Sequence, residues 1–286
     1  MLRMNDQYRF HIRGNDFDFL SRTYIMGVLN VTPDSFSDGG FFFETTKAVE
    51  RGLQLAEEGA DVIDIGGEST RPGSEPVTEK QEIDRVVPVI ERLVREVTIP
   101  LSIDTCKASV AEAALRAGAS IINDISGMTF DPRMTHVAQQ NDATVVLMHM
   151  KGTPKTMQQA PQYENVTREV FEFLSIQYSK ARDHGIRQII VDPGIGFGKN
   201  LDHNLELIKG LKTFSQLGCP VLVGPSRKSV IGKLLDLPVD ERLEGTAAAV
   251  TACILHGANM IRVHDVKQMK RVARVADALK GSAAQL

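Results

Sequence analysis

The sequence predicts an α/β protein that folds as a closed (β/α)8 barrel, the TIM-barrel fold. Three observations carry this prediction. Short apolar runs recur along the chain, segments with helical spacing lie between them, and 286 residues suit one barrel of roughly 250 residues with a short extension. Apolar strands that alternate with helices indicate a parallel sheet covered on its outer face. An open, doubly wound sheet is the structural alternative, but it would normally contain fewer strands.

The strands can be placed from the apolar runs. A short β-hairpin is expected first, at about residues 9–20, where the runs RFHIR and FDFL flank a Gly-Asn-Asp turn. The eight barrel strands are then predicted at residues 24–29, 62–65, 100–103, 120–122, 144–148, 188–191, 220–223 and 259–263.

Helices are predicted between these strands. One segment has apolar residues at helical spacing, at Ile83, Val86, Ile90, Leu93 and Val97. The last segment repeats this spacing at Val266, Met269, Val272, Ala276 and Leu279. Pro88 lies in the first of these segments and is expected to kink the helix or divide it in two, because proline removes a backbone donor.

Bulk properties narrow the class of protein. No composition break divides the chain, so residues 1–286 are expected to form a single domain. A formal net charge of −3 does not indicate binding to nucleic acid or to a membrane surface. Cys106, Cys219 and Cys253 are far apart and form no CxxC motif, which favours a reduced, cytoplasmic compartment. The charged N-terminal segment does not resemble a signal peptide, and no apolar run approaches the length of a transmembrane helix.

Polar residues follow the predicted strands at one end of the barrel, where the active site of such a fold lies. They are Asn30, Asp64, Asp104, Asn123, Asp192, Lys228, Arg262 and His264. Taken alone, each aspartate at such a junction reads as a helix N-cap. Helix capping does not require amides and carboxylates on inward-pointing strand ends that face a lysine and an arginine. The group as a whole therefore predicts a binding site.

The chemistry of this group indicates what it binds. Asp104, Asn123 and Asp192 suit a flat heterocycle that presents amino, ring N–H and carbonyl groups along its edge. Lys228 could meet a ring carbonyl or nitrogen, and the planar guanidinium of Arg262 can stack on the ring while it reaches an anion. A second cluster of donors suits phosphate, and it consists of Asn30, Arg71, Arg262 and His264.

Other motifs have structural interpretations. His149 is expected to be a packed or hydrogen-bonded wall residue, and Cys106 has no evident histidine partner that would make it a nucleophile. GIGFG at 194–198 lacks the GxGxxG spacing of a dinucleotide loop. The absence of an HExxH motif or a Cys/His cluster argues against zinc.

Seven motifs together resemble the dihydropteroate synthase family. They span residues 24–270 and read MGVLNVTPDSFSDGG, DIGGESTRPGS, SIDT, INDISG, LMHMKGTPKTMQ, DPGIGFGK and GPSRKS, in the order found in that family. The resemblance implies an enzyme that condenses 6-hydroxymethyl-7,8-dihydropterin diphosphate with 4-aminobenzoate. The products are 7,8-dihydropteroate and diphosphate, in folate biosynthesis, and the family is the target of sulfonamides.

The resemblance also implies roles for individual residues. Asp104, Asn123 and Asp192 resemble the ligands of the pterin edge, with Asp64 near them, and Lys228 resembles the lysine over the pterin carbonyl. Asn30 resembles the residue that contacts Mg²⁺ and the diphosphate. The diphosphate region would be lined by Thr70, Arg71, Arg262 and His264. The aminobenzoate pocket would be shaped by Phe36, Pro72, Phe197 and Ser229, with Asp38 near the reacting carbon.

Further expectations concern the loops, the assembly and the alternatives. The helix that opens at residues 226–229 is expected to bind the aminobenzoate carboxylate at its N-terminus. The loops 31–43 and 67–77 have few aliphatic anchors, and we expect them to be mobile without ligand.

The family resemblance implies a homodimer. Two other functions compete: a pterin-binding methyltransferase domain of the corrinoid-dependent type, which would not need the NVTPDSF and STRPG loops, and a catalytically silent pterin-binding paralogue.

Overall fold

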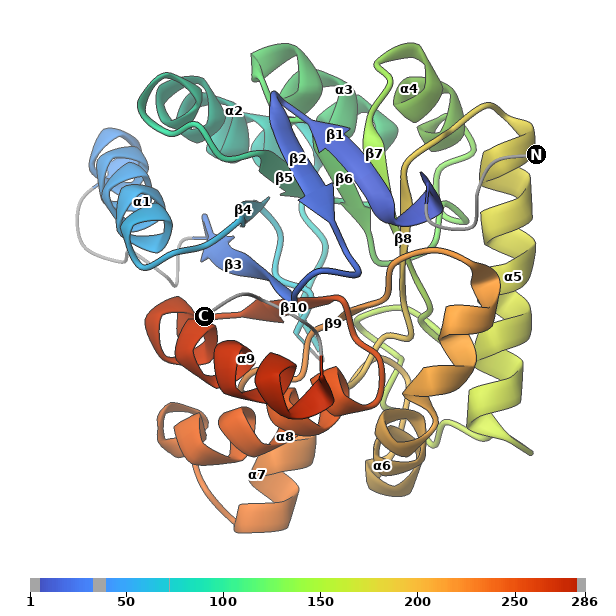
Figure 1. Ribbon diagram of the computed structural model, residues 1–286. Coiled ribbons are helices and arrows are strands. Elements are labelled where there is room, and N and C mark those ends of the chain that lie inside the picture. The colour runs from blue at the N-terminus through green and yellow to red at the C-terminus, as the bar shows by residue number, and fades with distance from the viewer. Residues whose placement is uncertain (1–5, 33–39, 72, 282–286) are drawn as a thin grey trace.

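The computed structural model describes residues 6–32, 40–71 and 73–281, and eight parallel strands form its centre (Figure 1). Their order in the sheet is β8-β7-β6-β5-β4-β3-β10-β9. All eight strands predicted from the sequence are present. They are β3 (Tyr24–Asn30), β4 (Val62–Gly66), β5 (Leu101–Asp104), β6 (Ile121–Asp124), β7 (Thr144–Met148), β8 (Ile189–Asp192), β9 (Leu222–Val223) and β10 (Met260–Val263).

The sheet closes on itself. A parallel bridge between Val191 and Val221 joins β8 to the chain just before β9, which links the two ends of the strand order. The predicted (β/α)8 barrel is therefore confirmed, and the open-sheet alternative is wrong.

Helices cover the outside of the barrel (Figure 1). They are α1 (Gly40–Glu57), α2 (Glu79–Glu96), α3 (Ala108–Ala117), α4 (Met134–Gln140), α5 (Val166–Asp183), α6 (Leu201–Lys209), α7 (Ser229–Leu235), α8 (Leu243–Leu255) and α9 (Val266–Lys280). Short 3₁₀ segments are η1 (Asp6–Tyr8), η3 (Leu211–Leu217) and η4 (Val239–Glu241). In the described part of the chain, no helix combines the length and the apolar character needed to cross a bilayer.

Pro88 does not divide its helix, so that part of the prediction is wrong. It lies inside α2, which runs unbroken to Glu96. Buried apolar residues flank the proline on both sides, with Val86 before it and Val89 and Ile90 after it. Their packing against the barrel compensates for the one backbone hydrogen bond that the proline cannot donate.

The predicted hairpin is present, with strands β1 (Arg9–Ile12) and β2 (Asn15–Asp18). Its turn differs from the prediction. Ile12 pairs with Asn15, so the turn consists of Arg13 and Gly14, which both have positive φ, at 48° and 74°. Two positive φ angles define the turn type whose twist fits a two-residue hairpin. The Gly-Asn-Asp turn is therefore wrong, because Asn15 begins the second strand.

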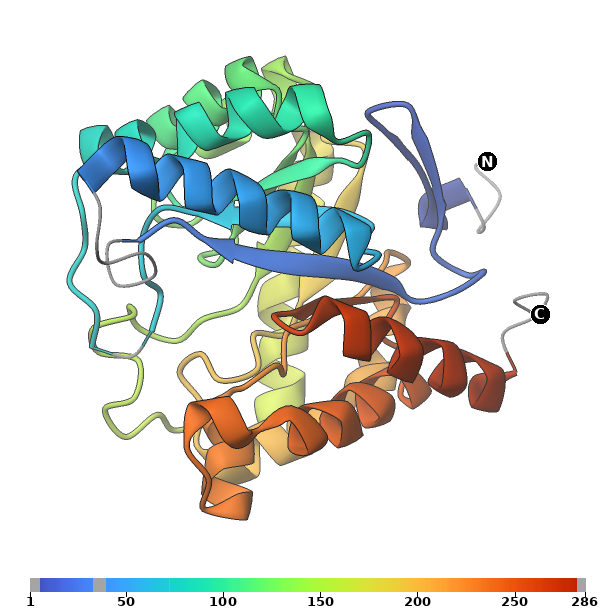
Figure 2. The same ribbon diagram turned by 90° about the vertical axis from the view of Figure 1, so that its left-hand side faces the viewer.

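The hairpin closes the amino-terminal end of the barrel, opposite the long loops (Figure 2). Its side chains Phe10, Ile12, Phe17 and Phe19 pack in one cluster with side chains from the barrel interior. The interior members are Met26, Val62, Ile121, Val146, Ile190, Leu222 and Met260. Water is thus excluded from this end, and only the other end remains for a ligand.

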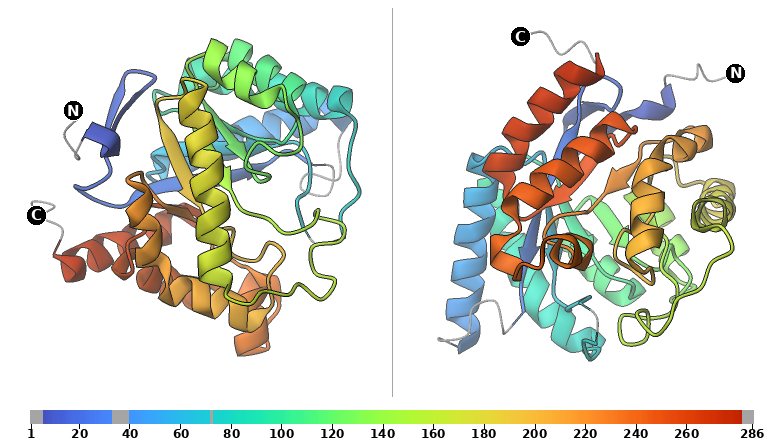
Figure 3. Two further views of the ribbon diagram at one scale, coloured as in Figure 1. Left: turned by 90° about the vertical axis from the view of Figure 1, so that its right-hand side faces the viewer. Right: turned by 90° about the horizontal axis from the view of Figure 1, so that it is seen from below.

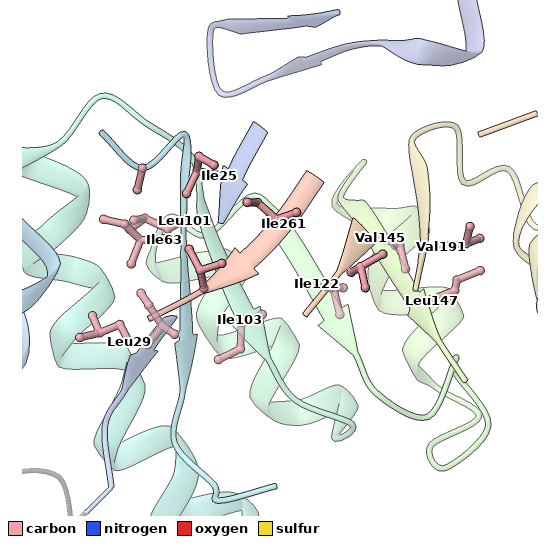
Figure 4. Packing of buried hydrophobic residues seen from close by; sticks show 14 of the residues in the cluster. Ile25, Leu29, Ile63, Leu101, Ile103, Ile122, Val145, Leu147, Val191 and Ile261 are labelled. Carbon is pink, nitrogen blue, oxygen red and sulfur yellow. The ribbon is translucent and has the colours of Figure 1, made fainter. Parts of the chain in front are cut away.

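Alternation along each strand separates the core from the site, because successive side chains point to opposite faces. Ile63, Ile103, Ile122, Val191 and Ile261 belong to the cluster that packs against the helices (Figure 4). The neighbouring positions point inward. Two residues beyond Val62, Ile121, Ile190 and Met260 of the plugged interior lie Asp64, Asn123, Asp192 and Arg262.

Two long loops lie side by side over the carboxyl ends of the strands (Figure 3). The β4–α2 loop contacts the β7–α5 loop through a hydrogen bond from Gly73 N to Pro154 O of 3.1 Å. An exposed ion pair between Lys155 and Glu75, at 2.7 Å, joins the same two loops. These contacts join the two loops above one side of the barrel mouth.

Candidate active site

A small cavity of about 20 Å³ lies at the carboxyl ends of the strands, and we call it the central cavity. Its lining contains six residues predicted from the sequence, which come from four strand ends and from the loops after β8 and β9: Asp104, Asn123, Asp192, Phe197, Lys228 and Arg262. Ile125, Met148, Ile195 and Gly224 complete the wall. Polar groups therefore converge on one point from around the barrel, against an apolar background typical of ligand pockets.

Arg262 reaches across the central cavity to two carboxylates. Its Nε donates to Asp64 Oδ2 and its Nη2 to Asp104 Oδ2, both at 2.6 Å. Burial disfavours the charged guanidinium, but Asp64 and Asp104 more than compensate and raise the pKa of Arg262 above its usual value. The small volume of the cavity follows, since the arginine side chain occupies the space between the acids.

Asp64 lies behind the cavity wall rather than in it. It is fully buried, and its Oδ2 also accepts a hydrogen bond of 2.9 Å from Asn123 Nδ2. It thus orients two residues that do line the cavity, Asn123 and Arg262. Direct contact between Asp64 and a substrate stays a prediction.

The two carboxylates of the cavity wall are held away from water, which disfavours their charged forms. Burial raises the pKa of Asp104 to about 7, although Arg262 opposes this shift. Burial also raises the pKa of Asp192 to about 6, and Asp192 Oδ1 accepts a hydrogen bond of 2.7 Å from Gly194 N. Asp104 Oδ1 has no hydrogen-bond partner within the described ranges, so a strong acceptor is free to receive a ligand donor.

Lys228 and Phe197 form the opposite wall. The Lys228 ammonium lies 4.0 Å from the centre of the Phe197 ring, a cation–π contact. Burial lowers the pKa of Lys228 to about 8, and the neighbouring Arg262 adds to the effect. A cation that is held over an aromatic face beside an apolar wall suits a carbonyl or ring nitrogen of a flat ligand.

His264 is oriented by Ser226, and the sequence interpretation missed this role of Ser226. The backbone N–H of His264 donates to Ser226 Oγ at 3.2 Å, and that hydroxyl lies 3.0 Å from His264 Nδ1. Since the hydroxyl hydrogen is free for Nδ1, the ring proton is assigned to Nε2. Burial and then Arg262 lower the pKa of His264 to about 3. His264 is therefore a neutral donor, with Nε2–H as the group left for a ligand.

The remaining predicted residues lie outside the central cavity. Asn30 ends β3 and is partly buried, Ser229 is exposed at the first residue of α7, and Arg71 is exposed. Thr70 lines a second cavity of about 490 Å³, which also contains Asp104 and lies beneath the β4–α2 loop. Phe36, Asp38 and Pro72 lie outside the described residues.

A partly buried ion-pair network anchors the β4–α2 loop, and the sequence interpretation missed it too. Lys107 binds Glu68 of the loop and Glu82 of α2, the latter at 2.6 Å. Arg85 Nη1 donates to the carbonyl of Gly67 at 2.7 Å. No motif marks this network, because Lys107 lies beyond the next strand, 39 residues from Glu68 and 25 from Glu82.

The surroundings of His149 and Cys106 are consistent with their structural interpretations. His149 is buried, its Nδ1 lies 3.0 Å from Lys199 Nζ, and burial lowers its pKa to about 2. Burial raises the pKa of the Cys106 thiol well above its ordinary value, which opposes formation of a nucleophilic thiolate.

The donor set suits a Mg²⁺ ion that arrives with its substrate. In the part of the chain that the structure describes, no group of three or more His, Cys, Asp and Glu side chains could hold a metal ion. Asn30 offers one carboxamide oxygen beside the barrel mouth. Mg²⁺ commonly takes one or two protein ligands and completes its shell with substrate phosphates and water.

Comparisons with known proteins show the family of this chain. The model of the family "Pterin binding enzyme" matches residues 26–264. A dihydropteroate synthase from Synechocystis is 50% identical over 266 residues, which cover 92% of this chain and 92% of the relative. This chain therefore belongs to the pterin-binding enzymes, and within them to the dihydropteroate synthase family.

Solved structures of that family have the same fold. The Yersinia pestis dihydropteroate synthase in a sulfonamide drug complex superposes with a TM-score of 0.89 at 41% identity, and the match covers 96% of this chain and 99% of that one. The Xanthomonas albilineans enzyme in complex with 7,8-dihydropteroate gives a TM-score of 0.85 at 41% identity, over 95% and 98% of the two chains. The family is one of transferases, as predicted.

Proposed function

We propose that this chain condenses 6-hydroxymethyl-7,8-dihydropterin diphosphate with 4-aminobenzoate, and that the central cavity binds the pterin. The observation that carries the proposal is the acid–amide–acid wall of Asp104, Asn123 and Asp192 with a free acceptor on Asp104. The edge of a pterin offers amino and ring N–H donors to such a wall. Lys228 would then meet the ring carbonyl on the opposite side.

The pterin takes the place of Arg262. A cavity of about 20 Å³ is too small for a bicyclic ring, and the guanidinium fills the space between Asp64 and Asp104. The pterin edge presents an N–C–N donor arrangement similar to that of a guanidinium, so it replaces these bonds in kind. The freed Arg262 can stack on the ring and reach the diphosphate.

The diphosphate is the leaving group. The amine nitrogen attacks the CH₂ carbon, the carbon–oxygen bond to diphosphate breaks, and the amine loses a proton. Fixed donors lower the barrier when they are placed where charge develops. We assign this task to Arg262, to the Nε2–H of His264, to Arg71 and to Asn30. Mg²⁺, held by Asn30 and the diphosphate, would supply positive charge to the leaving group.

The amine site is proposed beside Phe197, Lys228 and Ser229. The Phe197 ring offers an apolar wall, and Lys228 lies against it. The backbone N–H groups at the start of α7 offer donors for the carboxylate of 4-aminobenzoate, although α7 has only seven residues, so its dipole is small. Phe36 and Pro72 are proposed to complete this pocket, as the sequence predicts.

A homodimer through the barrel helices is also proposed. Val275 and Leu279 on α9 are 62% and 69% exposed, and Leu255 at the end of α8 is 45% exposed. Large apolar side chains on neighbouring helices form a surface that association would cover. Light scattering coupled to size-exclusion chromatography measures the mass, and an Asp substitution at Val275 should shift it toward the monomer.

An assay of diphosphate release tests the proposed reaction. Release that requires both the pterin diphosphate and 4-aminobenzoate is the expected result. A silent paralogue would bind pterin and release nothing, and a corrinoid-type methyltransferase domain would ignore the amine. Either outcome would contradict the proposal.

A further inference from the structure

Lys199 is a buried lysine that no part of the proposed mechanism uses. It is 2% exposed, and it directly follows the turn formed by residues 194–198, GIGFG. Its ammonium nitrogen has four acceptors: Gly194 O and Phe197 O, both at 2.9 Å, His149 Nδ1 at 3.0 Å and His149 O at 3.3 Å. A buried charge is tolerated only when its donors are matched in this way.

The turn before Lys199 needs an internal partner for its carbonyl groups. Gly194, Gly196 and Gly198 have φ of 73°, 85° and 63°, a region that favours glycine. The turn also lies against the end of β7, since a Cβ at Gly194 would come within 1.9 Å of His149 O. Three carbonyl oxygens, those of Gly194, Phe197 and His149, therefore point toward one spot, where they would repel one another without a cation.

Two further carbonyls of the turn are bonded by side chains from outside it. Gln158 Nε2 donates to Gly196 O at 2.9 Å, and Tyr163 Oη donates to Gly198 O at 2.8 Å. Lys199 is thus the internal partner, and it bonds the carbonyls of Gly194 and Phe197.

The turn connects directly to the central cavity. Its first residue, Gly194, donates its N–H to Asp192, and its fourth carries the Phe197 ring that contacts Lys228. Ile195 and Phe197 line the cavity. A change in the turn would therefore displace the aromatic wall and the lysine above it together.

We propose that Lys199 is a positioning residue for pterin binding: its ammonium acts as a tethered cation that holds the carbonyls of residues 149, 194 and 197 together and so fixes Phe197 against Lys228. This inference rests on the proposed assignment of Phe197 and Lys228 to the pterin site. It explains why the motif ends in lysine, although that lysine does not line the central cavity.

The charge of Lys199 is finely balanced. Burial lowers its pKa to about 7, and Asp192 partly offsets this. An ammonium shares three donors among these four acceptors, whereas the neutral amine has only two donors and leaves more of the acceptors unbonded. The charged form therefore matches the turn.

Two substitutions of Lys199 separate the effect of its charge from the effect of its side-chain volume. Lys199→Met keeps the volume of the side chain and removes the cation, whereas Lys199→Ala leaves a carbonyl-lined space. We expect the Kd for 6-hydroxymethyl-7,8-dihydropterin to rise about tenfold or more in both, equivalent to about 1.4 kcal/mol. Ammonium chloride should restore binding in Lys199→Ala but not in Lys199→Met, where the methionine fills the site. Sodium chloride at the same ionic strength should restore neither.

Isothermal titration calorimetry at a temperature at which circular dichroism shows a folded protein provides the measurement. Lys209→Met, which removes an exposed lysine from α6, is the matched control and should keep the wild-type Kd. A purely structural Lys199 would lower the melting temperature and leave the Kd of the folded variant unchanged, which would overturn the inference. Failure of ammonium to restore Lys199→Ala would overturn it as well. If Lys199→Met does not fold, the response of Lys199→Ala to ammonium tests the role of Lys199 by itself.

A separate variant distinguishes the inference from the assignment beneath it. Phe197→Ala should weaken pterin binding if the central cavity is the pterin site. Unchanged binding in Phe197→Ala would contradict the site assignment itself. Weak binding in Phe197→Ala together with normal binding in Lys199→Met would contradict only the role of Lys199.

Discussion

Replacing Asp192 by Asn isolates the contribution of one carboxylate to pterin binding. The hydrogen bond that Asp192 Oδ1 accepts from Gly194 N, at 2.7 Å, can be kept by the amide oxygen of asparagine. The fold should therefore tolerate the change. The second oxygen becomes an NH₂ group that faces the donors of the pterin edge, so an acceptor is lost where one is needed.

The magnitude follows from the kind of bond that is lost. A hydrogen bond to a charged group contributes about 1.5–3 kcal/mol, which corresponds to an increase in Kd of about 10- to 150-fold. Asp192 is buried, so solvent does not weaken this contribution much. We expect calorimetry with 6-hydroxymethyl-7,8-dihydropterin to report a Kd in this range, with a melting temperature close to that of the wild type.

Asp183→Asn is the control, because Asp183 is exposed at the end of α5 and should change neither quantity. If folded Asp192→Asn binds the pterin with wild-type affinity, then Asp192 is only a partner for the Gly194 backbone, and the acid–amide–acid wall is not a pterin site.

Three further predictions concern the same region. Arg262→Lys keeps the charge but loses the planar fork that bridges Asp64 and Asp104, so turnover should fall about tenfold or more, by about 1.4 kcal/mol, and wild-type steady-state kinetics would contradict the role of Arg262. Pterin affinity should rise with pH between about 5 and 7.5, because burial raises the pKa of Asp192 to about 6 and that of Asp104 to about 7, and only the ionised carboxylates accept two donors. Calorimetry across this range would refute the reasoning if the affinity were flat. Binding should be ordered: 4-aminobenzoate, or a sulfonamide mimic, is expected to bind measurably only with pterin, diphosphate and Mg²⁺ present, and tight binding to the free protein by calorimetry would show a preformed pocket.

The barrel and its polar mouth could be predicted because two general rules determine them. Strand residues alternate between the helix-facing core and the interior, so Ile63 and Asp64, or Val191 and Asp192, must point to opposite faces. Parallel strands also bring their carboxyl ends to one end of the barrel. These rules hold without knowledge of distant contacts, which is why Asp104, Asn123, Asp192, Lys228 and Arg262 were all found.

The missed features depend on contacts between residues that are distant in sequence. Ser226 orients His264, Lys107 joins Glu68 to Glu82, and no local pattern marks any of these pairs. The same reason explains the errors. Packing on both sides of Pro88 keeps α2 whole, and the local sequence does not show that packing.

The β4–α2 loop shows how polar anchors change a conclusion about mobility. Few aliphatic side chains hold this loop, as the sequence indicates, but its stems are bonded instead by the Lys107 network, by Arg85 to Gly67 O, and by Gly73 N to Pro154 O. Ion pairs that are partly shielded from water fix such stems more firmly than exposed ones would. Any rearrangement on ligand binding is therefore expected to centre on Thr70 and Arg71, between the anchored stems. We expect a displacement there to bring the Arg71 guanidinium to the diphosphate, so closure by the first substrate is compatible with anchored stems.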